Sequence, residues 1–201
     1  MRLLTALLLV LCCSGAQAQA HHDPLSAREV DQLRETAQQP QKRIDLLLDY
    51  TLDRVLAVDR LRAAGKLSSR DAAAMTALLA DIATLIDELD DNLEMYNGHS
   101  EDLRRALRHV ITAEDGFQKK LAALDTATSP AQKQLFAAAL ADATDSISAS
   151  MQSARTMLAN QLAKKGEEKD KEKRDRAEAQ SARRAAQEAG QEDRQRTPPE
   201  P

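Results

Sequence analysis

The chain has 201 residues, with 28 Lys and Arg against 32 Asp and Glu, and a formal net charge of −4. Aromatic residues make up only 2% of it and charged residues 30%, a composition that favours helices and argues against an all-β fold. Two cysteines exclude a disulfide-stapled scaffold, and so few aromatic rings argue against a stacking platform for nucleic acid.

Residues 1–20 have the features of a secretory signal peptide. Arg2 supplies a positive start, and residues 3–13 form an apolar stretch too short to span a membrane comfortably. Small residues then stand at the spacing of a cleavage site twice, in residues 16–18 and 18–20. The sequence therefore predicts an exported protein, periplasmic or secreted, with two candidate cleavage points.

Both cysteines, Cys12 and Cys13, lie within this leader. A lipoprotein is disfavoured, because an acylated cysteine prefers a small residue before it and Leu11 precedes Cys12. The mature chain is thus expected to hold neither a disulfide nor a thiolate metal site. No transmembrane segment is expected after cleavage.

The mature chain divides at about residue 164. Residues 21–163 carry 16 basic and 22 acidic side chains, whereas residues 164–201 carry 11 and 10 in a much shorter stretch. This charged tail lacks large apolar residues, so it is expected to be either a solvated helix or disordered. Its nearly equal charges argue against nucleic acid, because phosphate binding needs uncompensated positive charge.

Helix-start signals are frequent in residues 21–163. Ser26 and Glu29 fit a capping box that opens a short helix reaching about Gln39. Pro40 suits the first turn of a second helix, which is expected to end at about Ala64.

Three further helices follow in the prediction. Ser68, with an aspartate three residues later, opens a third helix that ends near Gly98. Ser100 opens a fourth helix, with Glu101 and Asp102 placing acidic groups at the positive end of its dipole. Ser129 and the proline after it open a fifth helix that continues past Leu162.

Apolar residues recur every three or four positions along the four longer helices, as bundle packing requires. The third helix shows the pattern at Leu79, Ile82, Ile86, Leu89, Leu93 and Tyr96. The sequence therefore predicts an all-α fold: an antiparallel four-helix bundle with an extra short N-terminal helix and the charged tail.

Four segments of the chain resemble an uncharacterised group of secreted, all-helical bacterial proteins. They read DPLSAREVDQLRETAQ at 23–38, PQKR at 40–43, IDELDDN at 86–92 and EDGFQ at 114–118. The resemblance covers most of the mature chain without its tail, and it implies an exported helical protein without implying an activity.

Two histidines stand close to the expected mature N-terminus. Cleavage after Ala18 would place His21 third, where an amine, two amides and an imidazole form a square-planar site for Cu(II) or Ni(II). Cleavage after Ala20 would leave His21 and His22 first, a pair that also chelates copper. A chance occurrence of histidine in a polar leader is the alternative, and Gln19 could cyclise and block the amine.

Asp87, Asp91 and Glu94 share one face of the third predicted helix. Such an acidic face attracts cations or a basic partner, and an ordinary solvated helix surface is the alternative. The segment lacks the spacing and the glycine of a calcium loop.

Glu114 falls on the apolar stripe of the fourth predicted helix, between Val110 and Phe117. A carboxylate at such a position must find a partner or have a raised pKa. With Gly116 close by, it could mark a kink, a close helix crossing or a binding cavity. Alternatively, Glu114 lies at the edge of the stripe and pairs with Arg or Lys on a neighbouring helix.

The sequence holds no combination of residues that predicts catalysis, so we expect a protein that is not an enzyme. Two functional classes stay open. The first is an exported helical interaction protein, an adaptor, scaffold or chaperone-like binder that has a protein partner and is either a monomer or a homo-oligomer. The second is a metal-handling protein that uses His21, His22 and surface carboxylates.

Overall fold

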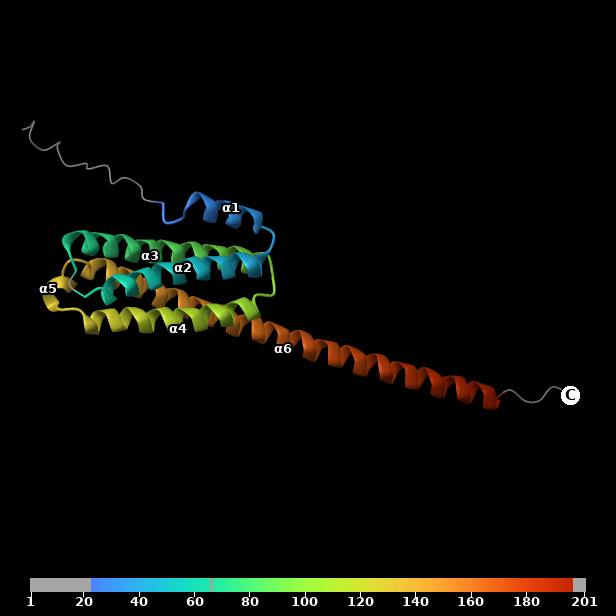
Figure 1. The fold of residues 1–201 in the computed structure, drawn as a ribbon. Helices are drawn as coiled ribbons and strands as arrows, with labels where there is room; N and C mark the ends of the chain where they lie inside the picture. The colour runs from blue at the N-terminus through green and yellow to red at the C-terminus, as the bar shows by residue number, and fades with distance from the viewer. Residues whose placement is uncertain (1–22, 66, 197–201) are drawn as a thin grey trace, which may run out of the picture.

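A computed structural model describes residues 23–65 and 67–196, and its regular secondary structure is helical throughout these ranges. Within these two ranges six helices follow one another (Figure 1): α1 (Ala27–Glu35), α2 (Pro40–Ala63), α3 (Ser69–Gly98), α4 (Arg104–Ala127), α5 (Pro130–Lys133) and α6 (Ala137–Arg196). The predicted all-α class is confirmed, and the number of helices is one more than predicted.

The long helices α2, α3, α4 and α6 lie side by side as a helical bundle (Figure 1). Helix α2 packs against α3 and α4, and α6 packs against the same two helices. Apolar side chains from all four meet between them, joined by Phe136 from the turn before α6. The largest fully buried side chains are Phe136, Ile44, Leu47, Met75, Leu79, Ile82, Leu85, Ile86, Leu89, Leu93, Leu107 and Leu121. The predicted stripe of α3 is buried along its whole length.

Two predicted helix starts are confirmed in detail. Ser26 and Glu29 form the capping box of α1: the Glu29 N–H donates to the Ser26 side chain, and the Ser26 N–H donates to the Glu29 side chain. Ser68 and Asp71 form an equivalent box at the start of α3. Pro40 is the first residue of α2, where its missing N–H costs no helical hydrogen bond.

The predicted start of α4 at residues 100–102 is wrong, because the helix begins at Arg104. Ser100 adopts a left-handed conformation with φ 63°, and the Glu101 N–H donates to the Tyr96 carbonyl 3.2 Å away, so this stretch still closes α3. Leu103 then enters the core with only 2% of its surface exposed. Burial of Leu103 sets where the new helix starts, and the acidic residues precede it.

The prediction of one helix from Ser129 past Leu162 is also wrong. Helix α5 ends at Lys133, and a three-residue turn separates it from α6. Within this turn, the N–H groups of Leu135 and Phe136 donate to carbonyls three residues back, at 3.1 Å each. The turn places Phe136 in the core with 2% exposure and leaves Leu135 56% exposed.

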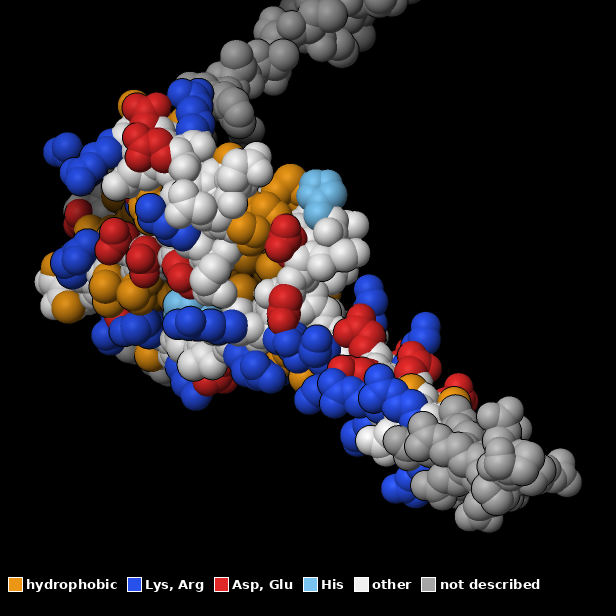
Figure 2. Space-filling view, turned by 90° about the vertical axis from the view of Figure 1, so that its right-hand side faces the viewer, with side chains coloured by type: hydrophobic (Ala, Val, Ile, Leu, Met, Phe, Trp, Pro, Cys, Tyr) orange, Lys and Arg blue, Asp and Glu red, His pale blue; other side chains and the backbone are white. Residues whose placement is uncertain are grey.

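Helix α6 leaves the bundle and continues as a projecting arm (Figure 1). Its packed half reaches Leu158, which still contacts the core, whereas every residue from 162 to 184 is exposed. At 1.5 Å per residue, the arm, residues 162–196, extends roughly 50 Å. Lys and Arg alternate with Asp and Glu along its described side chains (Figure 2).

None of the helices in the two described ranges combines the length and the apolar character that crossing a membrane requires.

Removal of residues 166–201 tests the separation of arm and bundle. Because residues 166–184 are exposed and none belongs to the core, their loss removes no core contact, and the melting temperature should change by no more than a few degrees. Thermal unfolding of the full and truncated chains, followed by circular dichroism, measures this. A larger fall would mean that the arm packs on the bundle.

Candidate functional site

Helix α1 is fastened to α2 by a bidentate ion pair. Arg54 Nη1 and Nη2 donate to the two carboxylate oxygens of Glu29 at 2.6 and 2.8 Å, and Nη2 also donates to the Pro24 carbonyl at 2.7 Å. Only 16% of the Arg54 side chain and 14% of the Glu29 side chain are exposed. The hydrogen bond from Arg54 lowers the pKa of Glu29 to about 2.

A second arginine joins three elements at the other end of α1. Arg43 Nη1 donates to the Leu33 carbonyl at 2.7 Å, Nε donates to Asn92 Oδ1 at 2.5 Å, and Nη2 lies 3.2 Å from Glu88 Oε1. Asn92 in turn donates to Glu88 at 2.9 Å. Arg43 and Arg54 together form the α1 clasp, which is built from residues of the resemblance segments and from Arg54.

Glu29→Gln tests the clasp. The ordinary carboxyl pKa of 4.5 falls to about 2 in the folded chain, so the pair stabilises the fold fully above pH 4.5 and loses this effect as the pH falls towards 2. We expect the free energy of unfolding of the variant to be lower than that of the wild type by about 3 kcal/mol at pH 7. This difference should vanish near pH 2. Urea unfolding across this pH range measures it.

Asp31→Asn on the same helix is the control. Asp31 forms a solvent-exposed pair with Arg34, with side chains 69% and 76% exposed, and such pairs contribute little. Equal losses for the two variants would contradict the special role of Glu29.

Glu114 lies at the centre of the bundle, with no exposed surface. Its Oε1 is 2.6 Å from Oγ of Ser150 on α6, and the same Oγ is 2.7 Å from Oδ1 of Asp90 on α3. Glu114 Oε2 has no hydrogen-bond partner. The polar chain Glu114–Ser150–Asp90 therefore links α4, α6 and α3 through one hydroxyl group.

This geometry requires an additional proton. A serine hydroxyl has one hydrogen, so it cannot donate to two carboxylates at once. Burial raises the pKa of Glu114 to about 8, which makes Glu114 the protonated member at neutral pH. Glu114 then donates to Ser150, and Ser150 donates to the carboxylate of Asp90, whose own pKa is raised by burial.

The alternative expectation for Glu114, an ion pair at the edge of the stripe, is wrong, because its contact is the Ser150 hydroxyl. The close crossing suggested at Gly116 is absent as well. A Cβ built there meets no atom within 4 Å, and α4 runs through this position as one helix. Ser150 carries a detectable signal in the sequence, since it interrupts the apolar stripe of α6 just as Glu114 interrupts that of α4.

The predicted acidic face is exposed on α3, next to the partner of Ser150. Asp87, Asp91 and Glu94 lie on the surface, and their charges contribute to the raised pKa of Asp90. Burial together with Asp91 and Asp142 raises the pKa of Asp87. The face thus adds negative potential outside the polar chain.

The predicted copper ligands His21 and His22 lie outside the described residues, so the copper site stays a prediction. His109 Nδ1 lies 2.9 Å from Asp45 Oδ1, a contact between α4 and α2 that sequence spacing did not indicate. Within the part of the chain that the structure describes, no group of three or more His, Cys, Asp or Glu residues is placed to hold a metal ion.

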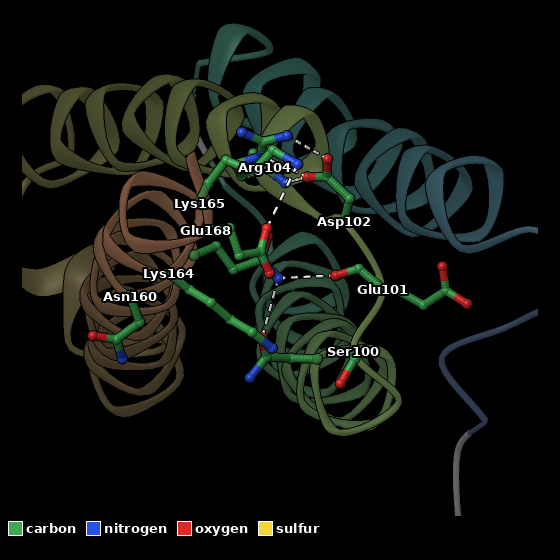
Figure 3. A pocket seen from close by; sticks show the side chains of 10 residues that line it. Ser100, Glu101, Asp102, Arg104, Asn160, Lys164, Lys165 and Glu168 are labelled. Carbon is green, nitrogen blue, oxygen red and sulfur yellow. Dashed lines mark hydrogen bonds and ion pairs between the residues drawn. The ribbon is translucent and has the colours of Figure 1, made fainter. Parts of the chain in front are cut away.

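A charged cleft of about 420 Å³ lies where the arm leaves the bundle (Figure 3). The residues that line it come from the end of α3, the α3–α4 connection, the start of α4 and α6: Asn97, Ser100, Glu101, Asp102, Arg104, Asn160, Gln161, Lys164, Lys165 and Glu168. We call it the root cleft. It combines cationic and anionic groups at one mouth.

One side chain of the root cleft holds its two walls together. Gln161 Oε1 accepts from the Leu103 N–H at 3.0 Å, while Nε2 donates to the Glu101 carbonyl at 3.0 Å and to Asn97 Oδ1 at 3.1 Å. Within the wall opposite α6, Arg104 Nε donates to Asp102 Oδ1 at 2.7 Å, and this contact lowers the pKa of Asp102 to about 2. The root of the arm is thereby fixed to the α3–α4 connection.

Comparisons with protein-family models, with curated proteins and with solved structures find no match for this chain.

Glu114→Leu tests whether the buried carboxyl costs stability. At pH 7 the folded chain must hold a proton that the unfolded carboxyl, with its ordinary pKa of 4.5, has released. Leucine removes this cost and leaves Ser150 its bond to Asp90, so we expect stabilisation of about 3 kcal/mol. Urea unfolding at pH 7 measures it.

Glu94→Leu, at an exposed position of α3, serves as the matched control and should change stability little. Destabilisation by Glu114→Leu would show that the carboxyl is better paired than its contacts indicate.

Proposed function

We propose that the protein is an exported, non-enzymatic interaction protein that presents the arm of α6 and the root cleft to a protein partner. One observation carries this proposal. A single helix is packed in the bundle over its first half and is exposed on all sides at residues 162–184. Beyond the root cleft, such an exposed helix has no core packing to stabilise it within its own chain.

The charge of the arm indicates the kind of partner. Its cations and anions alternate and form ion pairs along the helix, as in Arg176 with Glu172 and Lys165 with Glu168. Balanced charges suit a protein surface with a matching charge pattern better than a polyanion. The root cleft extends this mixed-charge surface onto the bundle.

The bundle is suited to act as a rigid base for the arm. The contacts α2–α3, α3–α6, α6–α4 and α4–α2 form a closed ring, and we infer an antiparallel four-helix bundle from this ring and the short connections. Export rests on the leader of residues 1–20, and the resemblance to secreted helical proteins favours the same compartment. We propose that bundle and arm act as an adaptor or scaffold.

Site-specific crosslinking in intact cells tests the function. A benzophenone side chain replaces Ala179 on the arm in one variant and Ala80, exposed on α3, in another. We expect one discrete adduct from the Ala179 position, and we expect the purified partner to bind the full chain more weakly at high salt or after removal of residues 166–201.

Identical adducts from both positions, or binding that survives loss of the arm, would contradict the proposal. An adduct between two copies of this chain would assign the arm to a homo-oligomer.

A further inference from the structure

The arm has no packing of its own, so its placement depends on how the first half of α6 packs against α3 and α4. At the middle of that packed half stands Ser150, whose hydroxyl contacts Glu114 on α4 and Asp90 on α3. It is fully buried, as are its neighbours on the packed face, Ile147 and Ala154. One proton therefore sits at the junction of the three helices.

We propose that Glu114, Ser150 and Asp90 form a proton-operated latch, in which loss of the Glu114 proton loosens α6 from α3 and α4. With the proton present, the chain of donors is complete from Glu114 through Ser150 to Asp90. Without it, two carboxylates compete for one serine hydrogen, and Glu114 Oε2 has no donor in reach. An unpaired charge in the interior is costly, and opening of the α4–α6 contact admits the water that relieves it.

The charges around the latch act in opposite directions. Asp90 from α3 raises the pKa of Glu114, whereas Arg155 from α6 lowers it. Behind Asp90, the face of Asp87, Asp91 and Glu94 adds further negative charge. Helix α2 also packs on α4 and contributes no charge that shifts the pKa of Glu114.

Arg155 is not held ready to replace the lost proton. It lies on the surface of α6, and its Nη2 contacts Met151 Sδ at 3.2 Å on its own helix. Deprotonation therefore leaves the interior with two negative groups and a cation outside.

The direction of the pH effect follows from the two pKa values. In the closed state the pKa of Glu114 is about 8, and an opened, hydrated carboxyl returns to the ordinary 4.5. Between these values each rise of one pH unit favours opening by roughly tenfold, and above pH 8 the effect levels off. The latch is closed in mild acid and is weakest in mild alkali.

Hydrogen exchange of the full-length mature chain between pH 5.5 and 8.5 tests the proposal. After correction for base catalysis of the exchange reaction, the opening constant of the amides at residues 147–154 of α6 should rise roughly tenfold per pH unit below pH 8. Glu114→Gln should abolish this slope, because its amide carries no titrating proton. Glu94→Gln, on the exposed acidic face, should retain it.

A second readout uses the wild-type chain, so it does not depend on whether a variant folds. The infrared band of a protonated carboxylic acid should be present in the wild-type chain at pH 6, should fall to about half by pH 8 and should be lost at higher pH. Absence of this band at pH 6, or an undiminished slope in Glu114→Gln, would overturn the latch. Equal slopes at residues 44–55 of α2 would also overturn it, because they would indicate global unfolding. None of these readouts requires a partner, so they are independent of the proposed function.

Discussion

A carboxyl group with no exposed surface, where α4 meets α6 and α3, is the main electrostatic constraint on how these three helices pack. Burial favours the neutral acid of Glu114 at neutral pH, and the protonated carboxyl can donate a hydrogen bond to the Ser150 hydroxyl. The proton thus converts an electrostatic cost into a link between α4, α6 and α3. Because the arm is the continuation of α6, the same link orients the surface proposed for recognition.

Two glutamates with shifted pKa values, the partly buried Glu29 and the fully buried Glu114, solve the same electrostatic problem in opposite ways. Glu29 meets a guanidinium and keeps its charge, with a pKa of about 2, whereas Glu114 meets a hydroxyl and gives its charge up, with a pKa of about 8. Charge retention suits α1, which is fastened from outside by directed ion pairs. Neutrality suits the bundle interior, where the surroundings are apolar side chains.

Sequence periodicity and capping rules predicted most of the helices because they depend on local physics. Ser26 and Ser68 cap the helices they were expected to cap. The starts of α4 and α6 escaped prediction because burial of Leu103 and Phe136 decides them, and burial depends on the neighbouring helices. Glu114 stood out as a polar interruption of a stripe, but its pairing with Ser150 needed the register of α4 against α6, which no single helix contains.

The persistence of the arm as a helix follows from the packed half of α6. An isolated charged helix must nucleate against an unfavourable entropy, and pairs such as Arg176 with Glu172 contribute only a few tenths of a kcal/mol each. Here nucleation has already occurred in the bundle, so the arm needs only propagation from residue 158 outward. Helicity must then weaken with distance from the root cleft. A partner that engages the root meets a preformed surface, whereas contacts nearer the tip must also order the chain, which costs affinity and confers adaptability.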